Sequence, residues 1–167
     1  SAFAAAQAEG VPLSDELALA VRERLSLVDR ELRESAEAAA VFVDILRWRG
    51  RVGLALRAMH ETGFLGRFLP EFGRVTFLVQ HDLFHRYTVD EHTLRAIEAL
   101  DEVASGTEAV VRPFGRVFDE VEDAAPLYLG MLLHDIGKGR GGGHVERGAG
   151  LAPRVCARLG LGERESE

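Results

Sequence analysis

The sequence predicts an all-α protein, and two observations carry that prediction. Apolar residues recur every three or four positions through most of the chain, which is the spacing that places them on one face of a helix. No stretch of five residues or more alternates cleanly between apolar and polar residues, so no strand is predicted. A length of 167 residues, with 47% hydrophobic and 28% charged residues, suits one globular unit with a core.

In the first part of the chain, glycines and capping residues divide the predicted helices. The first helix starts after Ser14, a residue type that caps helices, and its apolar face continues to Leu32. Two further helices are predicted around the apolar runs 41–46 and 54–59, each ended by glycine. The stretch 64–72 is predicted to be a short, turn-rich connector.

The middle of the chain holds a strong helix-start signal. Thr88 and Glu91 have the spacing of a capping box, so a helix is expected to begin there and to run to about Val103. His92 lies in its first turns and shares a face with Leu100, which directs the imidazole toward the core. An inward polar side chain needs a partner.

Two more helices are predicted after that one. Residues 107–122 form the first, with Pro113 at its start or at a bend. Residues 126–136 are apolar almost all round and therefore form a buried central helix. His134 and Asp135 are expected on its last turn, at the negative end of the helix dipole, which favours a cation.

Composition excludes several classes of protein. The net charge is -7 and lysine and arginine form no obvious cluster, which argues against a nucleic-acid partner. No run approaches the roughly 18 apolar residues of a membrane span. Cys156 is the sole cysteine, so neither a disulfide framework nor a cysteine-rich zinc site is expected. These observations favour a cytoplasmic protein without a membrane partner.

Candidate metal ligands stand at the end of the buried helix. His134 and Asp135 place an imidazole beside a carboxylate, groups that are unfavourable to bury unless a partner such as a divalent metal compensates them. His92 is a further candidate, and so is His144, which opens the last predicted helix. Each also has a structural interpretation: a hydrogen-bonded pair that closes a helix, a core histidine, or a solvent-facing residue at a helix start.

Motifs in the second half of the chain carry a resemblance to a known family. The pattern Asp90-Glu91-His92, then His134-Asp135, then His144 resembles the HD superfamily of metal-dependent phosphohydrolases. The longer runs DLFHRYTVDEHT (82–93) and HDIGKGRGG (134–142) are similar to bifunctional uridylyltransferase/uridylyl-removing enzymes of bacterial nitrogen regulation. Stretches upstream extend this resemblance to roughly residues 41–161.

The resemblance implies a fold, a reaction and a cofactor. The fold is a helical bundle of the HD-domain type, and the reaction is metal-dependent hydrolysis of the tyrosyl-uridylyl phosphodiester on the PII signal protein, which releases UMP. The cofactor is a divalent metal, Mn or Mg, with Fe or Zn as alternatives. The implied ligands are three imidazoles and one carboxylate: His92, His134, Asp135 and His144. The family's full protein also carries nucleotidyltransferase and ACT domains.

The resemblance also implies roles beyond metal binding. The residues expected to be catalytic are His134, Asp135 and Lys138. The residues expected to bind substrate are Lys138, Arg140 and His85. The glycine-rich loop lets a substrate approach closely while its two cations offset phosphate charge. The alternative is a solvated surface for the two cations and simple packing for His85.

The expected organisation is a leading helical linker over residues 1–63 and a partial HD-type hydrolase domain over 64–167. In the family, the hydrolase domain continues past the position of Glu167 and supplies another histidine and a closing aspartate. The bundle is therefore expected to be truncated at its C-terminus, and the segment alone inactive or weak. Two other functions stay open: a non-catalytic scaffold that docks PII or couples flanking domains, and a general HD-type nucleotide phosphohydrolase.

Overall fold

The computed structural model describes residues 1–79, 87–106, 112–139 and 143–162, and within these ranges it contains only helices and the turns between them. The all-α prediction is thereby confirmed. The first half holds α1 (Ala2–Glu9), α2 (Asp15–Glu23), the 3-10 helix η1 (Leu25–Leu27), α3 (Arg30–Glu34), α4 (Ala36–Arg47) and α5 (Val52–Glu61). The second half holds α6 (Phe64–Phe68), α7 (Pro70–Gly73), α8 (Val89–Ser105), α9 (Arg112–Asp119), α10 (Ala125–Leu133) and α11 (His144–Arg158).

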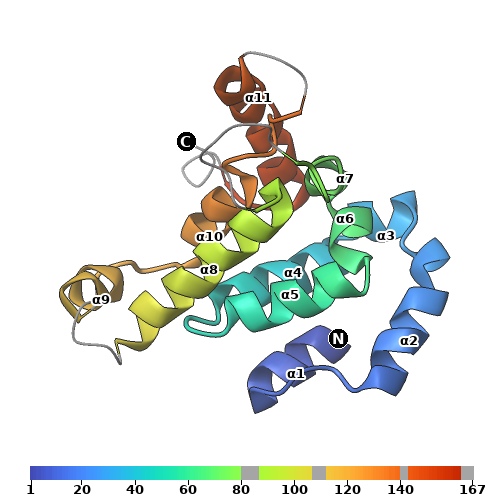
Figure 1. Ribbon diagram of the computed structural model, residues 1–167, viewed down its shortest axis with the longest axis horizontal. Helices are drawn as coiled ribbons and strands as arrows, with labels where there is room; N and C mark the ends of the chain where they lie inside the picture. Colours follow the sequence, from blue (N-terminus) through green and yellow to red (C-terminus); the bar gives the residue numbers. More distant parts are fainter. Residues whose placement is uncertain (80–86, 107–111, 140–142, 163–167) are drawn as a thin grey trace.

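Helices α5 and α8 form the centre of the molecule, where they run side by side (Figure 1). α10 packs against both α8 and α4, and α1 covers α5. α9 lies at the C-terminal end of α8, while α7 and α11 lie toward its N-terminal end (Figure 1). None of the helices in the described ranges is both long enough and apolar enough to cross a membrane.

A partly buried polar junction joins the three central helices. Asp101 of α8 accepts hydrogen bonds from the backbone N–H groups of Val52 and Gly53, at 3.2 and 2.7 Å, which satisfies the otherwise unpaired start of α5. The hydroxyl of Tyr128, on α10, donates to the same carboxylate at 2.6 Å. A Cβ on Gly53 would lie 2.8 Å from the Glu98 side chain, so glycine is needed for this close approach of α5 to α8.

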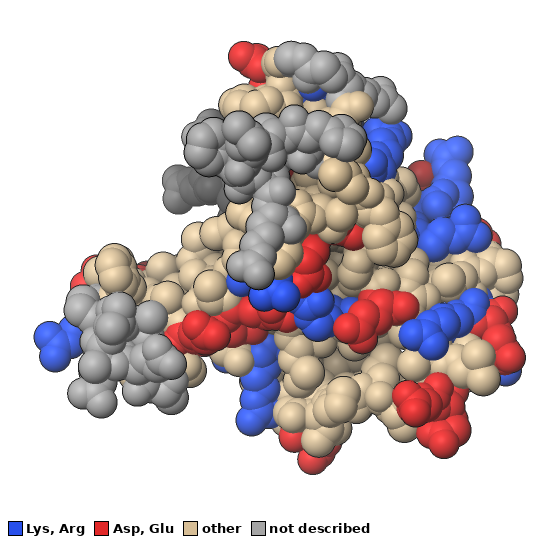
Figure 2. All heavy atoms as spheres, in the orientation of Figure 1, with Lys and Arg blue, Asp and Glu red and all other residues tan. Residues whose placement is uncertain are grey.

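The outer face of the same helix pair is charged. Arg57 of α5 makes ion pairs with Glu98 and, at 3.1 Å, with Glu91, both on α8. Arg95 pairs with Glu91 at 2.6 Å. Figure 2 shows acidic and basic side chains interleaved over this face, so the negative net charge is not concentrated there.

Two predicted elements differ from the structure in kind, and the helix predicted over 107–122 is shorter, since α9 ends at Asp119 and residues 107–111 lie outside the described ranges. The single helix expected from Ser14 to Leu32 is wrong, because α2, η1 and α3 divide this stretch. The side chain of Asp29 accepts a hydrogen bond from the Leu32 N–H at 3.0 Å and so starts a separate helix within the predicted one. The turn-rich connector expected over 64–72 is also wrong. It forms α6 and α7, and its apolar residues have the helical spacing and are buried: Leu65, Phe68, Leu69 and Phe72.

The helix starting near Thr88 is confirmed, but its predicted capping box is not. α8 begins at Val89, yet the Thr88 side chain makes no capping hydrogen bond among the described residues. The carboxylate of Glu91 pairs with Arg57 and Arg95 instead of turning back to the helix start. An arginine within reach is a stronger partner for a carboxylate than a neutral N–H group.

The carboxylate of Asp123 joins α4 to the start of α10 and leads to a prediction about stability and pH. Arg47 donates to Asp123 at 3.0 and 3.1 Å, and the Ala125 N–H donates at 3.0 Å. Burial alone would raise the pKa of Asp123, but these hydrogen bonds outweigh it and hold the pKa below its ordinary value. Because a lowered folded-state pKa stabilises only the ionised form, its contribution is lost as the pH falls below about 4.

Asp123→Ala should therefore lower the free energy of unfolding by about 1 kcal/mol at pH 7, and by less at pH 3, as measured by urea denaturation. Asp44→Ala is the control, because that carboxylate is 71% exposed and contacts the same arginine at 3.4 Å. An equal effect of Asp123→Ala at the two pH values would contradict this account.

Candidate metal centre

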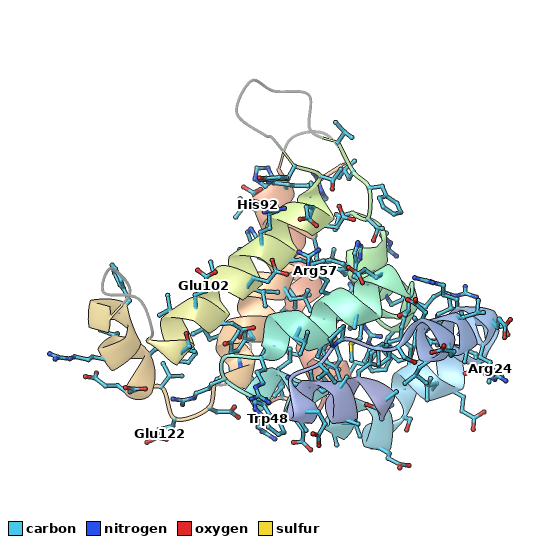
Figure 3. The ribbon with its side chains drawn as sticks, turned by 60° about the horizontal axis from the view of Figure 1, so that its bottom comes forward. Arg24, Trp48, Arg57, His92, Glu102 and Glu122 are labelled. Carbon is cyan, nitrogen blue, oxygen red and sulfur yellow. The ribbon has the colours of Figure 1, made fainter. Side chains whose placement is uncertain are left out.

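Three candidate ligands come together at one end of the bundle. His92 lies in the first turn of α8, while His134 and Asp135 lie in the turn that follows α10. One ligand atom from each lies within 4.8 Å of the others. Figure 3 shows His92 at the N-terminal end of α8. The structure thus brings together a pair and a histidine that are forty-two positions apart in the chain.

The two residues of the pair have different surroundings. His134 caps α10, whose last helical residue is Leu133, so the pair lies just beyond the helix instead of on its last turn as predicted. His134 Nδ1 lies 2.6 Å from the carbonyl oxygen of Met131, which can only accept, so Nδ1 carries a proton. His134 Nε2 lies 3.2 Å from Asp135 Oδ2, and its ring centroid is 5.6 Å from that of His92.

This donor set fits a divalent metal. With Nδ1 of His134 occupied, Nε2 and the Asp135 carboxylate face the same point, and a single cation can bind both. Asp135 is buried, while both imidazoles are exposed, so the prediction that His92 points into the core is wrong. A bound cation would be open to solvent on the imidazole side. Two nitrogens and one carboxylate oxygen suit Mn, Fe or Zn, and less well Mg, which prefers oxygen ligands.

Lys138 lies directly beside this group. Its ammonium donates to Asp135 Oδ2 at 2.7 Å, and the two side chains are 12% and 9% exposed. The backbone N–H of Lys138 also donates to the Asp135 carbonyl at 3.0 Å, so a tight turn holds the cation next to the carboxylate. Lys138 therefore holds the Asp135 side chain in position and brings a positive charge to the edge of the site.

The other predicted site residues are not part of this group. His144 is the exposed first residue of α11 and is not within the three-residue set. Its carbonyl oxygen packs so closely on Gly137 that a Cβ there would overlap with it, which brings the start of α11 against the turn after α10. His85 and Arg140 lie outside the residues that the structure describes. The metal role of His144 and the substrate roles of the other two stay predictions.

Asp90 supports the site, and although it stands in the Asp90-Glu91-His92 pattern, the sequence analysis gave it no role of its own. Its buried carboxylate accepts a hydrogen bond from the Phe77 N–H at 3.0 Å, and Oδ2 lies 3.2 Å from His60 Nε2. Oδ1 has no partner among the described residues. Phe77 has a φ of 58°, a left-handed conformation that bulky residues rarely adopt, and the bond to Asp90 holds it there. The first turn of α8, and with it His92, is thereby fastened to α5.

A sequence signal for Asp90 does exist. It lies four and seven residues before the buried Leu94 and Ile97, which places it on the inward face of α8. Its partner His60 is thirty positions upstream and could not be identified from local spacing. A cavity of about 700 Å³ lies at the other end of the chain, among α1 to α6, and is lined by none of the predicted site residues.

Two family models match this chain. Residues 2–68 match the model described as uridylyltransferase GlnD third domain, and residues 89–166 match the HD domain. The predicted boundary between 63 and 64 stays a prediction, since neither match begins or ends there.

Curated relatives match over almost the whole chain. It is 42% identical over 166 residues to the bifunctional uridylyltransferase/uridylyl-removing enzyme of Novosphingobium aromaticivorans, 41% over 166 to that of Azospirillum brasilense, and 43% over 168 to that of Rhodospirillum rubrum. These alignments cover 99%, 99% and 100% of this chain, and 18% of each relative. No solved structure matches significantly. The chain therefore belongs to the bifunctional uridylyltransferase/uridylyl-removing enzyme family, of which it spans the third-domain and HD-domain segments.

Proposed function

We propose that this chain carries the uridylyl-removing site of such an enzyme. The reaction is attack of water on the phosphorus that links UMP to a tyrosine of PII: a new P–O bond forms to water, the bond to the tyrosine oxygen breaks, and that oxygen takes a proton. The observation that carries the proposal is the His92, His134 and Asp135 group, which lies in the segment matching the HD domain.

The chain's own residues would hold and orient the reactants. His92, His134 and Asp135 would bind a divalent metal, which activates water and offsets charge on the phosphate oxygens. The bond from His134 Nδ1 to the Met131 carbonyl keeps the ring oriented with Nε2 toward the metal. Lys138 holds Asp135 in place and presents its charge to the phosphate.

The partners in this proposal belong to the whole protein. The chain spans 18% of the length of its relatives, so the nucleotidyltransferase domain, the ACT domains and PII itself are proposed from the family. A general HD-type phosphohydrolase and a non-catalytic scaffold are the alternatives. We further propose a cytoplasmic location, in keeping with Cys156 being the sole cysteine of the sequence.

Uridylylated PII tests this function directly. The protein that contains this chain should release UMP from it in the presence of Mn or Mg, and a chelator should stop the release. Free nucleotides serve as the control substrate, because a general phosphohydrolase would hydrolyse them equally well. Binding of PII without UMP release in either metal would indicate a scaffold and would overturn the proposal.

Lys138→Met should separate metal binding from uridylyl removal. Metal affinity should be retained or increased, because a positive charge 2.7 Å from a ligand oxygen is removed. Uridylyl removal should fall by about tenfold or more, because the phosphate loses a charge-assisted hydrogen bond. Metal titration and UMP release measure the two effects, and Lys138→Arg should restore part of the rate. Unchanged uridylyl removal in Lys138→Met would count against the proposed role.

A further inference from the structure

A second described cavity, of about 420 Å³, adjoins the metal group. The charged side chains that line it are all cationic: Arg74, Lys138, Arg147 and Arg154. No aspartate or glutamate of the described ranges takes part in the lining. Like charges gathered around one cavity repel one another, and an anion or a ligand rich in hydrogen-bond acceptors removes that repulsion.

Three separate segments bring these cations together. Arg74 follows α7, Lys138 follows α10, and Arg147 and Arg154 lie seven positions apart on one face of α11. Arg147 Nε donates to the Gly137 carbonyl at 3.1 Å, which anchors its guanidinium at the cavity wall. Arg74 and Arg154 are exposed and make no ion pair with any carboxylate in the described ranges. No carboxylate of the described ranges therefore neutralises their positive charges.

The rest of the lining suits the flat, uncharged part of a ligand. Leu78, Ile136 and Leu151 contribute apolar surface, and Gly139 and Gly150 are exposed glycines without a side chain to fill the space. A Cβ added to Gly150 would meet no atom within 4 Å, so the α11 side of the cavity is open space. The volume lies in the range of pockets for small molecules.

Lys138 links the cavity to the metal group. Lys138 lines the cavity, and its ammonium lies 2.7 Å from Asp135 Oδ2. A ligand with its phosphate beside Lys138 would therefore extend into the cavity from the edge of the metal centre. Arginine and lysine only donate hydrogen bonds, so these side chains select for acceptors. Uracil offers two carbonyl acceptors, whereas cytosine and adenine each present an amino donor.

We propose that this cavity binds the uridine nucleotide part of the substrate and discriminates uracil from amino-bearing bases. This subsite rests on the proposed function, and its arginines would give the uridylyl-removing site its specificity for uracil. The phosphate lies beside Lys138 at the edge of the metal centre, and the base lies among the arginines of α11 and Arg74.

The test is calorimetric titration of UMP, CMP and inorganic phosphate into the chain, with a chelator present so that metal coordination does not contribute. UMP should bind more tightly than CMP or phosphate. Arg74→Ala and Arg154→Ala should each weaken UMP binding by about tenfold, the size of a lost charge-assisted hydrogen bond. Arg24→Ala is the matched control, because this exposed arginine lies far from His92 (Figure 3) and should leave the affinity unchanged.

Gly150→Leu supplies an independent variant with no change of charge. Its side chain would fill the open space of the cavity, and leucine favours a helix more than glycine does, so the fold should be retained. UMP binding should be lost while the helical circular dichroism signal is kept. Equal binding of UMP, CMP and phosphate, or unchanged UMP affinity in both Arg154→Ala and Gly150→Leu, would overturn the inference.

The two proposals can fail separately. If the protein releases UMP from uridylylated PII but the cavity variants bind UMP with unchanged affinity, the subsite is wrong and the proposed function stands. If UMP binds as expected but no uridylyl group is removed with any metal, the subsite stands as a nucleotide site and the proposed function is overturned.

Discussion

Asp135→Ala is expected to abolish divalent-metal binding, with a loss of affinity of about a hundredfold or more. Asp135 supplies the one carboxylate of the three-residue group. Because its side chain is only 9% exposed, a water molecule cannot readily take its place as a metal ligand. The substitution also leaves the Lys138 ammonium beside the site without the negative charge that it contacts, and a cation there repels a metal. Titration with Mn, followed by elemental analysis, measures the effect.

Matched variants make this result specific. Asp119→Ala removes an exposed carboxylate from α9 and should leave metal binding unchanged. His92→Ala and His134→Ala should each weaken binding in the same titration, because each removes a member of the group. His144→Ala tests the predicted fourth ligand, and a loss comparable to that of His92→Ala would confirm that prediction. Near-native Mn affinity in Asp135→Ala would contradict the metal centre.

Asp101→Ala is expected to have the largest effect on stability, lowering the free energy of unfolding by about 3 kcal/mol. The substitution leaves the N–H groups of Val52 and Gly53 and the fully buried hydroxyl of Tyr128 without their acceptor. Leaving a buried donor without an acceptor lowers the free energy of unfolding by more than an average hydrogen bond contributes to it. Urea denaturation at neutral pH measures the loss.

The neighbouring residue Glu102 provides the control for this prediction. It lies on the same helix and is exposed (Figure 3), so Glu102→Ala should change stability by no more than about 0.5 kcal/mol. Tyr128→Phe should be less destabilising than Asp101→Ala, because it removes one donor and leaves the helix cap intact. The two substitutions should be non-additive when combined, since they share a hydrogen bond. A loss below 1 kcal/mol for Asp101→Ala would show that water satisfies these donors.

The same junction should depend on pH. Burial raises the pKa of Asp101, against the opposing effect of the hydrogen bonds from Tyr128 and the start of α5. Because the folded-state pKa of Asp101 lies above the unfolded value, the folded protein binds this proton more tightly than the unfolded chain does. The contribution of proton binding by Asp101 to the free energy of unfolding is therefore complete below pH 4, and it is lost as the pH rises through the folded-state pKa. The stability difference between the native protein and Asp101→Asn should therefore shrink as the pH rises above 4.

Local sequence patterns were sufficient to predict most of the helices. Apolar spacing is a property of neighbouring residues, so the positions of α8 and α10 were predicted to within a few residues. The prediction from apolar spacing failed where a short polar residue starts a new helix, as Asp29 does. It also failed in 64–73, where glycines and Pro70 masked a helical spacing of apolar residues. In both cases the local sequence favours two structures, a helix and a turn, and tertiary packing selects between them.

The residue types of the candidate site could also be predicted from the sequence, because an imidazole and a carboxylate at the end of an apolar helix require a partner. How these residues come together in one site could not be predicted from the sequence. Whether His92 meets His134, and whether Asp90 meets His60, depends on how α8 crosses α10 and α5.

The cationic cavity illustrates the same limit. Arg74, Lys138 and Arg154 have no common spacing in the chain, and nothing in the sequence distinguishes them from other surface cations. They form one lining because α7, α10 and α11 end or begin at the same end of the bundle. The sequence alone therefore determined the helices and the chemical types of the ligands, since both depend on near neighbours. Only the tertiary structure decided which charges share a site, because that depends on contacts between helices distant in the chain.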